Sequence, residues 1–138
     1  MIDSKRAEPS IIQSYRDLKV WQEGMALAEQ CYLLTRAFPR DEMFGLTGQI
    51  RRAAASIPAN IAEGYGRDST GEFVRFLQIA QGSLKELETH LLLSVRVGFL
   101  SGSNAEPALA HADALGRMLR SYYRRLQSRA PRSPRSMP

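Results

Sequence analysis

The sequence is poor in the residues that build disulfides and β-sheets. Its 138 residues include one cysteine, so the chain cannot form an internal disulfide, and this suits a reducing compartment. Valine, isoleucine and threonine are sparse, and no run alternates between polar and apolar residues with the two-residue period of a half-buried strand. These absences exclude a disulfide scaffold and argue against a sheet.

Long apolar segments are also missing. No stretch approaches the roughly 18 uncharged apolar residues of a membrane-spanning helix. The N-terminal residues MIDSKRAEPSIIQSYRDLK lack the apolar run of a signal peptide. We therefore expect a cytoplasmic protein that makes no membrane contact. Its length is sufficient for one domain with its own core.

What the sequence does contain is apolar residues at helical spacing along most of its length. Start and stop signals divide them into four predicted helices. The first covers 17–38, with Asp17 as N-cap and Pro39 as its stop. The second covers 44–63, with Gly64 and Gly66 as its stop signal. The third covers 69–97 and opens with a Ser69–Glu72 capping box; the fourth begins at Asn104 with Pro107 in its first turn.

Four helices joined by short loops predict an all-α, antiparallel up-down-up-down four-helix bundle. The bundle occupies residues 15–128. Residues 1–14 are polar and predicted to be a flexible N-terminal arm, whereas residues 129–138, RAPRSPRSMP, are predicted to be a disordered basic tail rich in Pro, Ser and Arg. In the first helix, a stripe with Trp21, Met25 and Tyr32 lies beside a second apolar stripe, which makes its apolar arc wider than one core needs.

A proline interrupts the second helix, within QIRRAAASIPANIAEGYGR (49–67). Pro58 cannot donate to the Ala54 carbonyl, at a cost of about 3 kcal/mol in a helix interior. Alanines surround it, so we predict a continuous helix kinked at Pro58 rather than a break. The Ala54 carbonyl then needs another donor: water, Arg52, Asn60 or a partner chain.

Polar residues on the same helix recur at spacings of three and four and therefore share one face. Two interpretations stay open: a stripe facing solvent, or a hydrogen-bond network at a helix contact. The members of this polar stripe are Gln49, Arg52, Ser56, Asn60 and Glu63.

Positive charge is concentrated near the C-terminus. The net charge is +5, but residues 15–128 carry 14 basic and 12 acidic residues and are only mildly basic. Arg117, Arg120 and Arg124 share one helix face with Arg125 beside them. This pattern is typical of a solvated outer face or of a surface that contacts phosphates. Tyr122 and Tyr123 are interleaved, and stacking on bases depends on their exposure.

Catalytic chemistry finds little support. Cys31 lies on an apolar stripe, where a buried inert thiol is expected. Glu86 and His90 are four residues apart and share a helix face, but two ligands do not make a metal site. The chain has no Gly-rich phosphate loop and no Glu-x-x-His pair at inner helix positions. We expect no enzyme activity, cofactor or metal.

Three segments carry a resemblance to a known family: YRDLKVWQEGMALA, FPRDEMFGLTGQIRRAAASIPANIAEGYGR and FLQIAQGSLKELETHLLLSVRVGFL. They resemble the bacterial 23S rRNA intervening-sequence proteins, also called "four helix bundle proteins", over residues 15–100 and loosely beyond. The resemblance implies a bundle that assembles into a pentameric ring. The similar accessory variability determinant proteins of diversity-generating retroelements bind a reverse transcriptase and present a basic surface to nucleic acid. The family implies no catalytic residues.

Together these observations favour a non-enzymatic homo-oligomer, a pentamer by resemblance, that binds nucleic acid and first of all RNA. The expected phosphate contacts are Arg51, Arg117, Arg120, Arg124 and Arg125. The alternative is a protein–protein adaptor for a reverse transcriptase or a ribosome-associated protein, with no nucleic-acid role of its own.

Overall fold

The protein folds into four long helices and two short helical turns. The computed structural model describes residues 11–129, and it contains no strand within that range. The predicted all-α class and the four helices are confirmed. In chain order the elements are η1 (Tyr15–Asp17), α1 (Lys19–Thr35), η2 (Arg40–Glu42), α2 (Leu46–Tyr65), α3 (Thr70–Arg96) and α4 (Gly102–Arg129).

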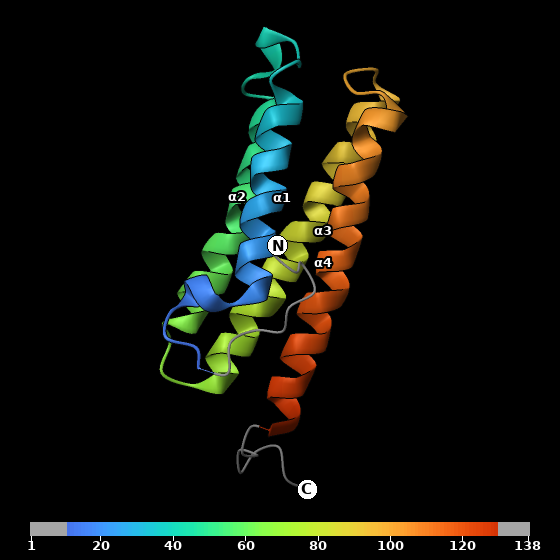
Figure 1. Cartoon of the computed structure of the whole chain (residues 1–138). Helices are drawn as coiled ribbons and strands as arrows, with labels where there is room; N and C mark the ends of the chain where they lie inside the picture. Colours follow the sequence, from blue (N-terminus) through green and yellow to red (C-terminus); the bar gives the residue numbers. More distant parts are fainter. Residues whose placement is uncertain (1–10, 130–138) are drawn as a thin grey trace, which may run out of the picture.

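Figure 1 shows the helices side by side, each running opposite to the one before it. Each helix packs against its neighbours in the sequence, and α1 also packs against α4. The α2–α3 contact is the most extensive and the α1–α4 contact the least. Among the described helices, none is long and apolar enough to cross a membrane.

The core follows a repeat of leucines along α3. Leu77, Leu84, Leu87 and Leu91 are completely buried, as the 4–3 spacing of an antiparallel seam requires. On α4 the first half of the inner stripe is built from alanines, which are also fully buried and let α4 approach its neighbours closely: Ala105, Ala108 and Ala112. Small side chains therefore form the core at the start of α4.

The start of α1 differs from the prediction. Asp17 does not cap α1; its carboxylate accepts hydrogen bonds from the amides of Gln13 (2.9 Å) and Ser14 (3.2 Å) and closes η1 instead. Ile12 packs against the core, and its carbonyl accepts a bond of 3.4 Å from the Tyr65 hydroxyl. The last residues of the predicted arm are thus part of the folded bundle, while residues 1–10 and 130–138 lie outside the described residues.

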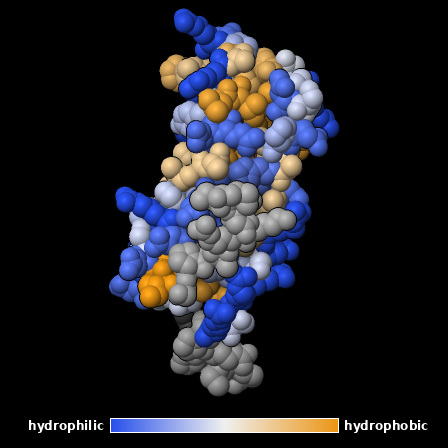
Figure 2. Space-filling model, in the orientation of Figure 1, coloured by the Kyte–Doolittle hydropathy of each residue, from blue (hydrophilic) through white to orange (hydrophobic). Residues whose placement is uncertain are grey.

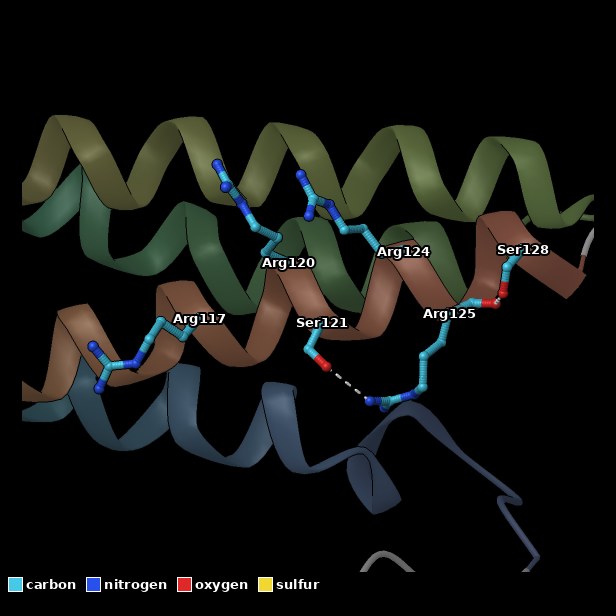
Figure 3. Close-up of a pocket in the computed structure, with 6 residues that line it drawn as sticks. All are labelled: Arg117, Arg120, Ser121, Arg124, Arg125 and Ser128. Carbon is cyan, nitrogen blue, oxygen red and sulfur yellow. Dashed lines mark hydrogen bonds between the residues drawn. The ribbon is translucent and has the colours of Figure 1, made fainter.

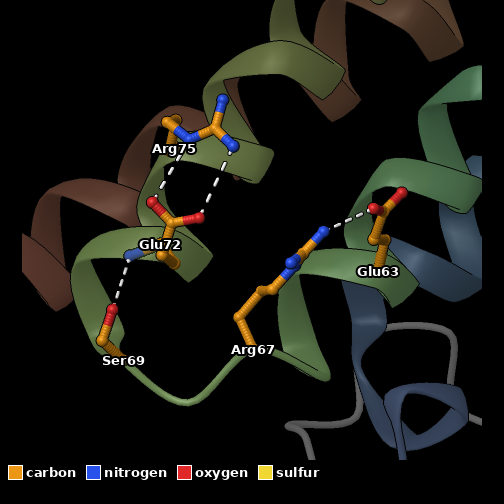
Figure 4. A network of polar contacts seen from close by, with 5 residues as sticks. All are labelled: Glu63, Arg67, Ser69, Glu72 and Arg75. Atoms are coloured by element: carbon orange, nitrogen blue, oxygen red, sulfur yellow. Dashed lines mark hydrogen bonds and ion pairs between the residues drawn. The ribbon is translucent and has the colours of Figure 1, made fainter.

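The other helix ends show which signals were interpreted correctly. Ser69 caps α3, because its hydroxyl accepts the Glu72 amide at 3.1 Å, but the Glu72 carboxylate pairs with Arg75 instead of completing the box (Figure 4). Of the two glycines predicted to stop α2, Gly64 is wrong, since the helix continues through it to Tyr65, and Gly66 is confirmed as the C-cap. α4 begins two residues earlier than predicted, so Pro107 lies in its second turn.

Pro58 lies inside a helix that does not break. α2 is continuous from Leu46 to Tyr65, as predicted, and the kink stays a prediction. The proline ring is buried against α1 at Gly24, where an added Cβ would come within 3.5 Å of it. Of the donors proposed for the Ala54 carbonyl, Asn60 bonds elsewhere: its side-chain amide donates to the Ser56 carbonyl at 2.8 Å. The neighbouring Ser56 hydroxyl donates to the Ala53 carbonyl at 3.0 Å.

Candidate nucleic-acid interface

The last four turns of α4 carry a surface of one charge sign. Residues 114–129 contain five arginines and no acid, and the buried side of this segment is set by Leu115 and Leu119. Their spacing turns the remaining positions outward. Six side chains line an open pocket of about 500 Å³, which we call the α4 basic face (Figure 3): Arg117, Arg120, Ser121, Arg124, Arg125 and Ser128.

The four arginines of the α4 basic face differ in what holds them. Arg117 pairs with Asp113 one turn earlier. Arg125 donates to the Ser121 hydroxyl at 3.0 Å and lies over the Tyr122 ring, 5.6 Å from its centre. Arg120 and Arg124 are exposed and make no hydrogen bond or ion pair with any other described residue. Exposed ion pairs contribute at most about 1 kcal/mol, so a phosphate can displace Asp113 at low cost.

The two tyrosines do not form a stacking platform on this surface. Tyr122 and Tyr123 are half-buried and pack against the core. The Tyr122 ring meets Phe73 of α3 edge to face, with 5.9 Å between centres, and Phe73 meets Tyr65 of α2 in the same way. These aromatic rings therefore join the helices at this end of the bundle.

A second groove extends the α4 basic face onto α3. It has a volume of about 290 Å³, and its α3 side is formed by Gln81 and Lys85. Gly116 has no side chain to separate the two helices. They lie close together at this point, as shown by the Gln81 side-chain amide, which donates to the Gly116 carbonyl at 2.9 Å. Lys85 pairs with Glu88 at 3.1 Å. Gln81 and Lys85 were not among the predicted site residues, although Gly116 within an apolar helix pattern was a signal of close helix approach.

Arg51 is not brought together with the other predicted phosphate contacts. It lies near the start of α2, at the opposite end of the bundle from the arginines of α4 (Figure 1). Its guanidinium donates to the Thr35 hydroxyl at 2.9 Å and to the Tyr32 carbonyl at 3.4 Å, and lies 4.7 Å from the Tyr32 ring centre. Arg51 thus satisfies the C-terminal end of α1, where carbonyls lack helical partners and a cation is favoured.

We expect Arg51→Met to lower the free energy of unfolding by about 1–2 kcal/mol, because it removes two hydrogen bonds and the ring contact but keeps the apolar stem. Urea unfolding followed by circular dichroism measures the change. Arg52→Met is the matched control, since Arg52 is exposed and its loss should cost under about 0.5 kcal/mol. Equal effects of the two substitutions would contradict the role assigned to Arg51.

The polar stripe of α2 bonds mostly within its own helix. Gln49 and Arg52 are exposed, and Glu63 pairs with Arg67 at 2.7 Å (Figure 4). Ser56 and Asn60, described above, bond carbonyls of α2 itself. The hydrogen bonds of the described residues therefore fit the solvent-facing interpretation better than a network between helices.

Cys31 and His111 could serve in catalysis, but the first is buried and the second is bonded to another helix. Burial raises the pKa of the Cys31 thiol to about 12, so the thiol stays protonated and unreactive at neutral pH. The His111 ring bridges α4 to α1, with its nitrogens 2.7 Å from a Glu23 carboxylate oxygen and 3.2 Å from the Gln30 amide oxygen. Within residues 11–129 no three His, Cys, Asp or Glu side chains gather as a metal site would require.

Two groups of apolar side chains lie at the surface of the described bundle, apart from the single exposed residues Ile11 and Ile79. A groove of about 410 Å³ runs between α1 and α2, where Trp21 and Met25 face Pro58 and Ala59. The other group lies at the end of the bundle where α1 ends, visible at the top of Figure 2. Phe44 is 93% exposed there. The segments that end or begin at this end of the bundle also expose large apolar side chains: Leu33, Met43, Leu92, Leu93 and Val97.

Comparisons with known proteins place the chain in a family. The profile of the family described as 23S rRNA-intervening sequence protein matches residues 16–121, which include Arg117 and Arg120 but not Arg124 and Arg125. A protein of unknown function from the S23 ribosomal protein family of Bacteroides thetaiotaomicron VPI-5482 has a similar fold, with a TM-score of 0.68 and 24% identity over 75% of this chain and 97% of that one. No curated protein matches the chain. The chain belongs to the 23S rRNA-intervening sequence protein family.

Proposed function

We propose that the protein is a non-enzymatic, homo-oligomeric scaffold that binds nucleic acid, and RNA in particular, through the α4 basic face. The observation that carries this proposal is the exposed group of four arginines and two serines on one side of α4, in a segment without acidic residues. Arginine is suited to phosphate, because its planar guanidinium presents several donors at once. Membership of the family supports the proposal only through the family's name.

Fluorescence anisotropy with labelled RNA and DNA tests this proposal. At about 50 mM salt and micromolar protein, phosphate-driven affinity is near its strongest. We expect saturable binding of RNA that weakens steeply as salt is raised. The absence of binding under these conditions would contradict the proposal.

We propose further that the chain assembles into a ring of five, as its family resemblance implies. The exposed apolar groove between α1 and α2 and the apolar end around Phe44 support assembly, because soluble monomers seldom expose large apolar patches. Light scattering should give a mass several times the 15.5 kDa of one chain. The mass of a single chain would refute assembly.

Pro58→Ala tests whether the proline shapes the assembling surface. The Pro58 ring lines the apolar groove, so we expect its removal to weaken assembly by about tenfold in dissociation constant, while helicity by circular dichroism stays unchanged. Pro107→Ala is the control, because Pro107 is exposed on α4 away from the groove. If Pro58→Ala alters neither assembly nor stability, the proline is incidental.

The apolar end around Phe44 also favours a second candidate function, a protein–protein adaptor. A side chain exposed as fully as Phe44 is typical of an anchor that a partner protein buries. Purification from native lysate after nuclease treatment separates the two functions. A protein partner that persists supports the adaptor, whereas one that is lost with the RNA supports nucleic-acid binding.

A further inference from the structure

The α4 basic face has two edges and a low centre. At 3.6 residues per turn, Ser121 and Ser128 fall close to one line along the helix, with Arg120 and Arg124 on one side of it and Arg125 on the other. Figure 3 shows this arrangement: Arg120 and Arg124 extend toward α3, whereas Arg125 extends toward α1. The guanidinium groups thus diverge instead of converging on one small anion.

The centre line is built from small side chains. Ser121 and Ser128 are exposed on it, and the exposed Ala110 and Ala114 continue it toward the start of α4. The arginines at the two edges belong to one helix, which with its side chains is about 10–12 Å across. A nucleic acid that lies along the small side chains of the centre line can therefore place phosphates beside the arginines at both edges.

Each of the two serine hydroxyls can form one more hydrogen bond, one as a donor and the other as an acceptor. The Ser121 hydroxyl accepts a bond from Arg125, so its proton is still available for donation. The Ser128 hydroxyl donates to the Arg125 carbonyl at 2.9 Å, so its oxygen can still accept. A ribose 2′-hydroxyl is both donor and acceptor, and it is the group that distinguishes RNA from DNA.

We infer that the α4 basic face binds double-stranded RNA across the minor groove. The minor groove of an A-form duplex is wide and shallow and displays 2′-hydroxyls between two phosphate backbones. Arg120 and Arg124 contact one backbone, Arg125 contacts the other, and the serines contact the 2′-hydroxyls between them. Single-stranded RNA is recognised mainly by stacking on aromatic side chains, and the half-buried Tyr122 and Tyr123 offer none here. This inference rests on the proposed function and specifies its ligand.

A comparison of three labelled ligands tests the inference on the full chain. They are an RNA duplex of about 16 base pairs, the size that minor-groove readers of RNA span, one of its strands alone, and the DNA duplex of the same sequence. At about 100 mM salt we expect the RNA duplex to bind at least tenfold more tightly than either of the others. Equal or tighter binding of the single strand or the DNA overturns the inference and leaves the proposed function standing. Failure to bind any of the three contradicts both.

A double variant tests the role of the serines. We expect Ser121→Ala with Ser128→Ala to weaken binding of the RNA duplex about fivefold more than binding of the DNA duplex. Ser103→Ala, on the exposed first turn of α4, is the control and should leave both affinities unchanged. Circular dichroism verifies that the variants are folded. An equal loss for RNA and DNA, or no loss, overturns the assignment of the serines to 2′-hydroxyls.

Discussion

Gly64→Ala is expected to lower the free energy of unfolding by about 2–3 kcal/mol. A Cβ at this position would lie 2.5 Å from the Cβ of Phe76 and 3.1 Å from a ring carbon of Phe73. Both neighbours belong to α3, so the new methyl group must push α2 and α3 apart along the most extensive contact of the bundle. Alanine is favoured over glycine in a helix by about 1 kcal/mol, and the loss should appear in spite of that gain.

Gly82→Ala provides the matched control. Gly82 is also inside a helix, α3, but a Cβ there would meet nothing within 4 Å. We expect this variant to gain up to about 1 kcal/mol from helix propensity alone. Urea unfolding at one fixed protein concentration measures both, so that the proposed assembly, which would make apparent stability depend on concentration, affects both variants alike. Stabilisation by both substitutions would show that α2 and α3 are not as close as the structure has them.

Gly64 also shows how far the sequence predicts the fold. The class and the four helices could be predicted because buried leucines such as Leu84 and Leu87 repeat at an unmistakable helical period. The helix ends could not. A glycine after an apolar run indicates a stop, but Gly64 is there to admit Phe76 from another helix. Asp17 was a good N-cap candidate, yet its carboxylate closes the turn before α1.

The candidate site shows the same division. Helical spacing placed Arg117, Arg120 and Arg124 on one face, because a single helix fixes their relative directions. It could not find the partners of Arg51, since Thr35 is sixteen residues away across a loop. It could not settle the exposure of Tyr122 either, because that depends on Phe73 of α3. At this site the relative directions of the arginines depend on one helix and were predictable, whereas the partners of Arg51 and the exposure of Tyr122 depend on a second helix and were not.

The double substitution Arg120→Gln with Arg124→Gln is expected to weaken RNA binding about 25- to 60-fold at 0.1 M salt. Each phosphate contact changes the slope of log K against log salt by about 0.7–0.9, which amounts to roughly five- to eightfold in affinity at this salt concentration. The two arginines are exposed, and no other described residue pairs with them, so their full charge is available to phosphate. Anisotropy titrations across about 50–300 mM salt should show the slope reduced by about 1.4–1.8.

The loss of two positive charges would by itself weaken binding to RNA. A matched double variant separates this effect from the loss of the two phosphate contacts. Arg36 and Arg96 are exposed at the ends of α1 and α3, which lie at the opposite end of the bundle from the C-terminal turns of α4 (Figure 1). Arg36→Gln with Arg96→Gln removes the same charge, and we expect it to reduce affinity less than threefold and to leave the salt slope unchanged. A Debye length of about 10 Å at 0.1 M salt limits the influence of charges at that end on phosphates bound along α4. If both double variants lose affinity equally, the attraction is diffuse and the α4 basic face is not the binding site.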